Sequence, residues 1–304
     1  MPIQLTSSPL RLSAPLPSKD GKKLFVVGQT FRGELMRYDS KASHFLPFRS
    51  GISAEFVTYS KDRQWVAYVT YPEGALWRSK ADGSERLQLS YAPLHPLAPR
   101  WSPDGRQIVF WCRIPRRPER TFVVSSAGGS ARQLMPDDPE PQSDPNWSPD
   151  GGKIVFSHSP DDPHSDICVL DLSSHQVSTV PESQGLYSPR WSPDGRYIVA
   201  MPVDSLSLVL FDFQTRKWSE LRKGSAAFPN WSADGRYVYF WQPDNPAVYR
   251  VRISDHKAER VADMKDFPIA GSLGGWLGLA PDDSPLLLRD AGSADIYALD
   301  WEAP

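Results

Sequence analysis

A short turn pattern recurs along the chain and constrains the fold more than any other feature of the sequence. Its full form is a tryptophan followed by S-P-D-G or S-A-D-G, and the four full copies begin at Trp101, Trp147, Trp191 and Trp231. Three degenerate turns, SKDG at Ser18, SKDR at Ser60 and APDD at Ala280, extend the series to seven copies at steps of 40 to 48 residues. A sequence period of this size is typical of structural units that stack on one another.

Each repeat predicts four β-strands. Within the turn, Pro103 presets φ at the first corner, Asp104 suits the second, and Gly105 takes the left-handed position that closes a hairpin. An apolar strand such as QIVFWC follows, then a second strand such as DICVLDLSS and a third such as KAERVAD, with little helical periodicity. Four-stranded antiparallel units at this period are typical of propeller blades. We therefore predict an all-β fold, a seven-bladed β-propeller that forms a single domain over residues 1–304.

The last repeat ends at DIYALDWEAP without a fourth strand. The N-terminal residues 3–6, Ile-Gln-Leu-Thr, resemble the outer strand Leu-Gln-Leu-Ser at 87–90. We therefore expect residues 3–6 to pair with the final blade as its outer strand and to close the ring. An unpaired edge there would invite association with other chains.

The four tryptophans are expected to fill the wedge between adjacent blades, where a large flat side chain fits. The residues immediately before them share one register and are polar: Arg100, Asn146, Arg190 and Asn230. On inner strands these side chains could line a central channel and bind a small polar ligand or ordered water. They could equally satisfy backbone groups between blades.

Two loops carry clustered charge. The segment RIPRRPER contains the candidate binding residues Arg113, Arg116, Arg117 and Arg120, whose guanidinium groups can bind carboxylates or phosphates. The alternative is that they pair with the acidic residues Asp137, Asp138 and Glu140 of the following loop. In the second segment the weak metal candidates are His158, Asp161, Asp162, His164 and Asp166, but their spacing fits no familiar ligand pattern. We therefore predict no metal and no other cofactor.

Composition excludes several classes of protein. The 34 basic and 36 acidic side chains nearly balance, which gives no general attraction to nucleic acid or to a membrane surface. No signal peptide and no run of eighteen apolar residues is present, so we expect no membrane insertion, while the compartment stays open. Cys112 and Cys168 lie in apolar strand patterns and are interpreted as buried free thiols. Neither a nucleophile elbow nor a dinucleotide or phosphate loop occurs, so no catalytic residue is assigned.

The repeated W-S-P-D-G followed by an apolar strand resembles the TolB-like propeller repeat, a relative of the WD-repeat blade, over essentially residues 3 to 301. Arrays of this kind are similar to the C-terminal propeller portion of larger bacterial regulators. The resemblance implies a non-enzymatic binding, sensor or protein-interaction module. We expect an unknown protein or a small polar ligand as its partner, and a monomeric state. The alternative is a propeller enzyme, a lyase or a hydrolase, with its site at the channel mouth.

Overall fold

The computed structural model describes residues 10–114, 116–158 and 163–300. Within these ranges the chain forms 27 β-strands and one short 3-10 helix, η1 (Arg49–Gly51). The strands form seven antiparallel sheets, of which six have four strands and one has three. No helix in the described part of the chain has the length and apolarity needed to cross a membrane.

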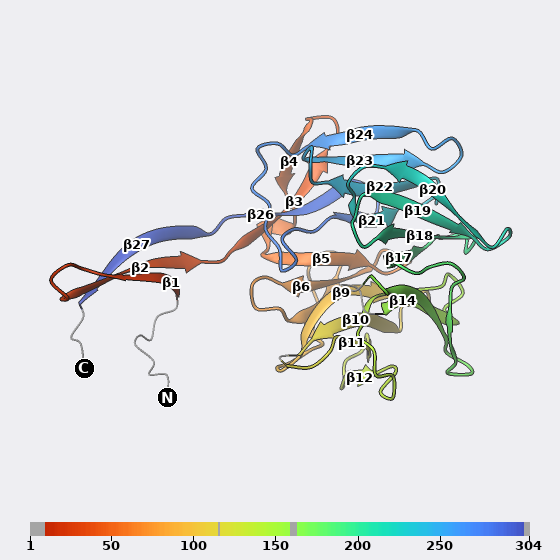
Figure 1. Cartoon of the computed structure of the whole chain (residues 1–304), viewed down its shortest axis with the longest axis horizontal. Helices are drawn as coiled ribbons and strands as arrows, with labels where there is room; N and C mark the ends of the chain where they lie inside the picture. Colours follow the sequence, from red (N-terminus) through yellow and green to blue (C-terminus); the bar gives the residue numbers. More distant parts are fainter. Residues whose placement is uncertain (1–9, 115, 159–162, 301–304) are drawn as a thin grey trace.

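Six four-stranded sheets are arranged as blades around a central axis (Figure 1). The first blade is β5 (Ala54–Tyr59), β6 (Trp65–Thr70), β7 (Leu76–Lys80) and β8 (Leu87–Gln88). The second is β9 (His95–Trp101), β10 (Gln107–Arg113), β11 (Arg120–Ser125) and β12 (Arg132–Gln133). The third is β13 (Gln142–Trp147), β14 (Lys153–His158), β15 (Asp166–Asp171) and β16 (Val177–Thr179).

The fourth blade is β17 (Leu186–Trp191), β18 (Tyr197–Pro202), β19 (Ser207–Asp212) and β20 (Lys217–Lys223). The fifth is β21 (Ala227–Trp231), β22 (Tyr237–Gln242), β23 (Ala247–Arg252) and β24 (Ala258–Asp263). The sixth combines both ends of the sequence: β25 (Gly278–Leu279), β26 (Pro285–Asp290), β3 (Gly33–Asp39) and β4 (His44–Pro47).

The inner strands close the ring. Strands β5, β9, β13, β17, β21 and β25 each contact the next inner strand, and β25 returns to contact β5. The closing blade is held by pairing between β26 and β3, in which Leu288 lies opposite Leu35 and Leu287 opposite Met36. Its outer strand is β4, so residues 44–47 take the place that the sequence suggested for residues 3–6, which lie outside the described residues.

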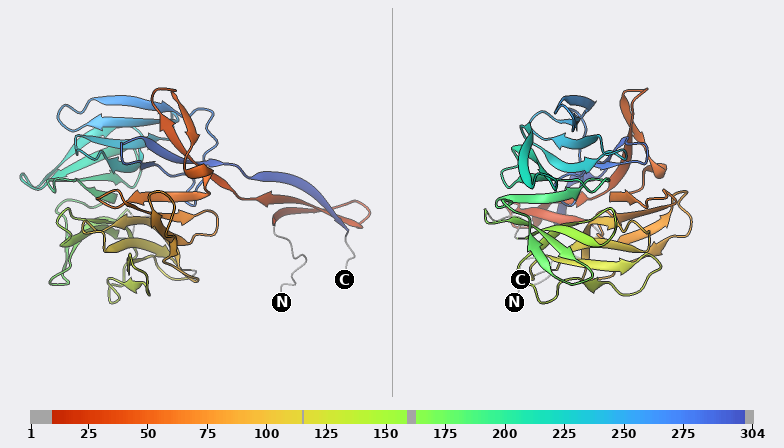
Figure 2. Two further views of the ribbon diagram at one scale, coloured as in Figure 1. Left: turned by 180° about the vertical axis from the view of Figure 1, so that it is seen from behind. Right: turned by 90° about the vertical axis from the view of Figure 1, so that its right-hand side faces the viewer.

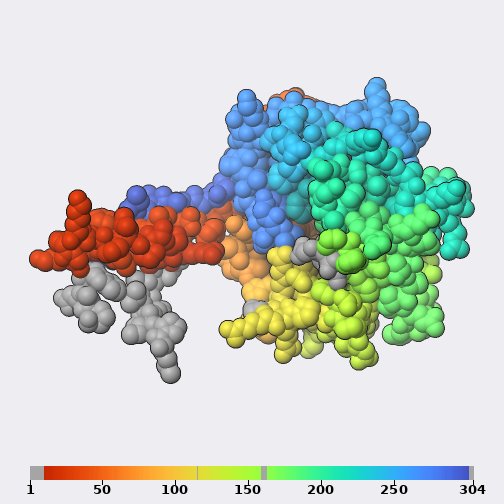
Figure 3. All heavy atoms as spheres, in the orientation of Figure 1, coloured from red at the N-terminus to blue at the C-terminus, as the bar shows by residue number. Residues whose placement is uncertain are grey.

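The three-stranded sheet forms an arm that consists of β1 (Arg11–Pro17), β2 (Lys23–Thr30) and β27 (Ser293–Asp300), with β2 in the middle. It projects from the side of the ring in two opposite views (Figures 1 and 2) and stands apart from the rounded body in the space-filling view (Figure 3). The arm continues the closing blade. Thr30 pairs with Ser293 in the arm and Gly33 with Asp290 in the blade, which is one unbroken register.

The predicted all-β propeller is confirmed, and its seven antiparallel sheets match the seven predicted blades in number. One sheet differs from the predicted four-stranded blade, because it has three strands and forms the arm. Because β26 pairs with β3, the strand that follows it in the sequence, β27, is left to pair with β2. The first and last repeats are therefore divided between the closing blade and the arm. The physical reason is burial: Leu35 and Met36 of β3 are fully buried in the ring, whereas nearly all of β27 is exposed.

The turn motif has the same hydrogen bonds in the ring and in the arm. The hydroxyl of Ser102 donates to Asp104 and accepts the amide of Gln107, while Asp104 also accepts the amide of Arg106. Equivalent contacts occur at Ser18 in the arm. Where arginine or aspartate replaces the turn glycine, at Arg63 and Asp283, φ is still +62°. The turn at Asp283 also has Ala280 in place of the serine, so the aspartate contact to the amide two residues later is the feature that all these turns share, and glycine only relieves the strain.

The tryptophans before the turns join neighbouring blades, as their position in the sequence predicted. The indole of Trp101 donates to the carbonyl of Thr58 in the preceding blade, that of Trp147 to Arg100, and that of Trp231 to Arg190. Trp191 is different, because its indole donates to Gly195 in its own turn and stacks on Phe213. The apolar second strands fill the space between blades; Phe110, Phe156 and Phe240 are fully buried there.

Candidate functional site: the central channel

A β-bulge shapes the wall of the channel at the same register in five inner strands. The bulged residues have φ between 45° and 55°: Phe56, Ala98, Asp144, Ser188 and Phe228. Four of them lie two residues before a member of the polar register identified in the sequence, and Phe56 lies two residues before Thr58. Each interrupts the pairing with the second strand. Non-glycine residues rarely adopt this conformation, and bulges redirect side chains. The same bulge occurs at Ala14 in the exposed strand Arg11–Pro17 of the arm, so it is a feature of the repeat and not of a binding site.

Two cavities open from the centre of the ring. One of about 480 Å³ lies among the turn motifs, and one of about 360 Å³ lies toward the loops at the other face. Arg100, Asn230 and Trp276 line both cavities and so lie between them. Aromatic side chains form part of the wall of the loop-side cavity: Phe56, Trp111, Tyr187, Phe228, Trp241 and Trp276. Its volume lies at the lower end of the range of small-molecule sites.

Three adjacent inner strands bring two guanidinium groups and one carboxylate into the loop-side cavity. Arg190 is 5% exposed, and its Nη2 lies 3.1 Å from Oδ1 of Asp144. Arg100 donates to the carbonyl of Pro99, and within the described chain it has no ion-pair partner. Burial, followed by repulsion from Arg190, lowers the pKa of Arg100 to about 9, which leaves it charged at neutral pH. The three groups together carry one excess positive charge.

Four residues that line the same cavity each have a buried polar atom without a hydrogen-bond partner among the described residues. The atoms are Nε1 of Trp111, Oγ of Ser143, Nε of Arg190 and Nε1 of Trp241. Three of these atoms can only donate a hydrogen bond. A buried donor without an acceptor costs about 1–3 kcal/mol, so such groups are normally satisfied by water or by a ligand. The cavity therefore carries excess positive charge, and unpaired donors lie buried in its wall.

The two asparagines of the predicted polar register bind backbone groups. Oδ1 of Asn146 accepts the amide of Trp191 in the next blade, and Nδ2 of Asn230 donates to the carbonyls of Phe228 and Leu277. The two arginines of the register instead carry charge into the channel. Both arginines also donate to a backbone carbonyl, of Pro99 and Pro189, and their binding of a ligand stays a prediction.

The predicted arginine loop lies at the rim of this cavity. Arg113 lies 3.6 Å from Glu119 of its own loop and over the ring of Trp111, and both Arg113 and Glu119 line the cavity. Arg120 reaches the following loop, where it donates to the carbonyl oxygens of Pro139 and Glu140 and not to a carboxylate. Arg116 and Arg117 are exposed, and neither forms an ion pair within the described chain. Only Arg113 of the four therefore contributes to the cavity wall.

The candidate metal residues are divided by the structure. His158 and Asp166 lie together at the loop end of the third blade, whereas His164 contacts Gln184. Asp161 and Asp162 lie outside the described residues. Both cysteines are buried free thiols, as predicted, and burial raises the pKa of Cys112 to about 11 and of Cys168 to about 12.

Several residues of the site were not found in the sequence. Asp144 lies two positions before Asn146, at the position of the bulge. A search of the sequence for polar residues two positions before the polar register would have found it. Trp111 and Trp241 occupy equivalent places at the end of second strands. Glu55 is fully buried and accepts hydrogen bonds from the amide and hydroxyl of Ser272, which ties the loop after the fifth blade to the first. Burial raises the pKa of Glu55.

No protein-family model matches the chain, and no curated protein matches its sequence. Solved structures do match its fold. A TolB protein from Agrobacterium tumefaciens is 18% identical, with a TM-score of 0.68 over 86% of this chain and 99% of that one. TolB from Acinetobacter baumannii is 16% identical, with a TM-score of 0.58 over 95% and 81%. Oligogalacturonate lyase from Vibrio parahaemolyticus is 14% identical, with a TM-score of 0.58 over 94% and 92%.

At these identities the similarity establishes the fold alone. The neighbours include TolB proteins as well as a lyase, so the fold is shared by proteins of different function. The repeated turn, the ring of four-stranded blades and the structural matches agree, and the chain has the fold of the TolB-like β-propellers.

Proposed function

We propose that this propeller is a binding module that holds a small organic anion in the loop-side cavity, without converting it. The observation that carries the proposal is the uncompensated positive charge of Arg100 in this cavity, together with unpaired buried donors on residues that line it. Arg100 has no carboxylate partner in the described chain, and buried donors of Trp111, Arg190 and Trp241 are unpaired. A carboxylate supplies both the negative charge and the acceptor oxygens that this arrangement lacks.

The walls of the cavity favour an apolar, flat body attached to that carboxylate. Six aromatic side chains line the cavity, and two of them, Trp111 and Trp241, each have a buried, unpaired indole N–H group. Such residues combine apolar contact area with a directed donor. The volume of about 360 Å³ suits a ligand of few heavy atoms and not a folded partner.

Simple aromatic carboxylates are suitable probes. Titration calorimetry with benzoate and phenylacetate is expected to show binding, and their uncharged amides, benzamide and phenylacetamide, are expected to bind far more weakly. Replacement of Arg100 by glutamine should lower the affinity for the acids by about 10- to 100-fold, since a hydrogen bond to a charged group contributes about 1.5–3 kcal/mol. Arg106→Gln is the matched control, because Arg106 is exposed on a turn at the opposite face.

The stability of the same variants separates binding from folding. Arg100 has no described carboxylate partner, so Arg100→Gln removes a poorly compensated buried charge and should leave the melting temperature unchanged or raise it. Equal binding of acids and amides, or unchanged affinity in Arg100→Gln, would reject the proposal. If instead a variant of the exposed Arg116 and Arg117 loses affinity, the binding surface is the rim. Chemical change of the recovered probe would favour the enzyme alternative.

A further inference from the structure

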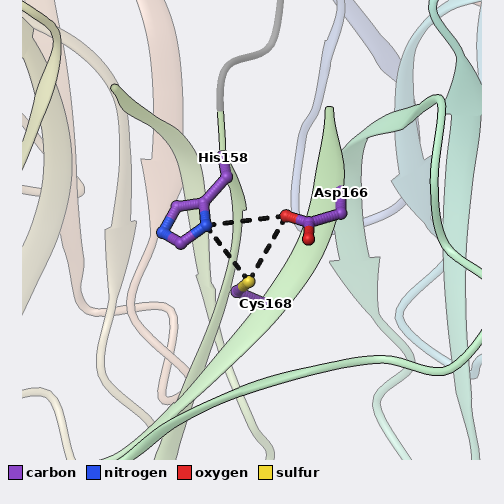
Figure 4. A group of neighbouring side chains, drawn as sticks. All are labelled: His158, Asp166 and Cys168. Carbon is purple, nitrogen blue, oxygen red and sulfur yellow. Dashed lines mark hydrogen bonds and ion pairs between the residues drawn. The ribbon is translucent and has the colours of Figure 1, made fainter. Parts of the chain in front are cut away.

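A second cluster of reactive side chains lies outside the channel, at the loop end of the third blade. Strands β14 and β15 pair so that His158 is directly opposite Asp166, and Cys168 follows two residues later on the same face of β15. The sequence spacing alone suggested no metal, because the three residues come together only through this cross-strand register. Figure 4 shows the three side chains pointing toward one another.

The potential ligand atoms of the three side chains form a nearly equilateral triangle. Nδ1 of His158 lies 3.4 Å from Sγ of Cys168 and 3.5 Å from Oδ1 of Asp166, and the sulfur lies 3.5 Å from the same oxygen. Tetrahedral zinc has Zn–N, Zn–O and Zn–S bonds of about 2.0–2.3 Å, which places its ligand atoms about 3.4–3.6 Å apart. The triangle therefore matches one face of a zinc coordination tetrahedron.

A fourth residue orients the imidazole. Oδ2 of Asp138, from the loop between the second and third blades, lies 2.8 Å from Nε2 of His158. If Nε2 carries the proton and donates to this carboxylate, Nδ1 presents its lone pair to Cys168 and Asp166. Metal-binding histidines almost always donate their second ring N–H to such a partner, which fixes the ring and its tautomer. Phe156 packs edge-on against the same ring with centroids 5.0 Å apart.

Burial leaves the cluster accessible from one side. Cys168 is 1% exposed, whereas the side chains of His158 and Asp166 are 19% and 29% exposed. A metal ion could therefore enter from solvent, and water could occupy the fourth ligand position. Nitrogen, oxygen and sulfur ligands together favour zinc and similar transition metals over calcium or magnesium, which prefer oxygen alone.

We propose that His158, Asp166 and Cys168 bind one zinc ion, with Asp138 as the residue that positions the imidazole. This site is separate from the channel and does not depend on the proposed binding of an anion there. On binding, the thiol of Cys168 loses its proton to solvent and the sulfur coordinates the metal as a thiolate. No oxidation or reduction is involved.

Cobalt(II) titration of the metal-stripped, full-length protein tests the proposal, because cobalt occupies zinc sites and reports its ligands by absorption. We expect one equivalent of cobalt to produce tetrahedral d–d bands and a thiolate-to-cobalt charge-transfer band, and zinc to abolish both. Cys168→Ser should remove the charge-transfer band, whereas Cys112→Ser should keep it, because Cys112 is buried in another blade. Asp138→Asn should retain binding with about 10- to 100-fold lower affinity.

Two results would overturn the zinc site. One is the absence of metal-induced absorption in the parent protein, which would leave the cluster as a hydrogen-bond network. The other is a charge-transfer band that persists in Cys168→Ser. If Cys168→Ser does not fold, Asp166→Ala serves as the test variant, because Asp166 is more exposed than Cys168. This variant should no longer bind one equivalent of cobalt, and its circular dichroism spectrum should stay unchanged.

Discussion

The inner strand β9 of the ring and the strand β1 of the arm have the same local geometry in opposite surroundings. Both contain a bulge four residues before the turn serine, at Ala98 with φ 45° and at Ala14 with φ 50°. Both continue into the same serine–aspartate turn. Yet most of β9 is buried, whereas β1 is almost entirely exposed and Leu16 is 66% exposed.

The difference shows that the repeat encodes a hairpin and that burial decides whether the hairpin becomes part of a blade. In the closing blade the fully buried residues Leu35 and Leu288 face each other across β3 and β26. The corresponding contacts in the arm are made by Phe25 and Ala298, and Phe25 is 37% exposed. Apolar area removed from water stabilises a fold by about 25 cal/mol per Å². The pairing that buries more apolar surface therefore occupies the ring.

The largest expected difference between the two regions is the cost of removing a phenylalanine. Phe110 in the ring is fully buried and stacks on Phe122, so Phe110→Ala should lower the free energy of unfolding by about 3–5 kcal/mol. Phe25→Ala in the arm should cost much less, because the side chain is partly exposed. Chemical denaturation of both variants measures the two costs, and equal losses would mean that the arm is packed as tightly as a blade.

A smaller difference is expected for the turn aspartates. A hydrogen bond from Ser232, followed by the amide of Arg236, lowers the pKa of Asp234 from 3.8 to about 2. A carboxylate whose pKa is lowered by folding stabilises the fold above its unfolded value, and this contribution is lost as the pH falls from about 4 toward 2. The side chain is 42% exposed, so Asp234→Asn should cost at most about 1 kcal/mol at neutral pH and progressively less as the pH falls to 2 and below.

The matched control for this prediction is Asp20→Asn, because Asp20 makes the same turn contacts in the arm and its pKa is lowered in the same direction. Melting curves of the two variants from neutral pH to about pH 2 provide the comparison. We expect the ring transition to be unchanged in Asp20→Asn. A pH-dependent shift of that transition in the arm variant would show that the two regions unfold as one unit.

Much of the fold could be predicted from local sequence, because the turn, the strands and the tryptophan contacts are set by neighbouring residues. The position of β27 could not be predicted from the sequence. Strand β2 could pair with β27 or with β3, and both pairings satisfy similar local patterns. Which pairing buries more surface depends on residues about 260 positions away in the sequence. In the channel, the register of Arg100 and Arg190 was visible in the sequence. The contacts that distinguish them from Asn146 and Asn230 were not.

The metal cluster shows the same limit. His158 and Asp166 were recognised as candidates, but Cys168 was interpreted only as a buried thiol, because its ligand role depends on the cross-strand register of β14 and β15. The turn between those strands does not have a spacing that identifies this register. A sequence motif counts positions along one segment, so it does not detect ligands that come together from two paired strands.

Disulfide cross-linking of the arm tests most directly whether six blades close the ring and leave the arm outside. In a background with both native cysteines replaced by alanine, Gln29→Cys with Ala294→Cys places two thiols on directly opposite residues of β2 and β27. Opposed residues of antiparallel strands lie about 4.5–5.5 Å apart at Cα, which a disulfide can span. We predict rapid cross-linking of this pair and an unchanged ring transition. If β2 and β3 formed a hairpin in a seventh blade, Gln29→Cys would cross-link with Glu34→Cys instead. That result would contradict the six-bladed ring.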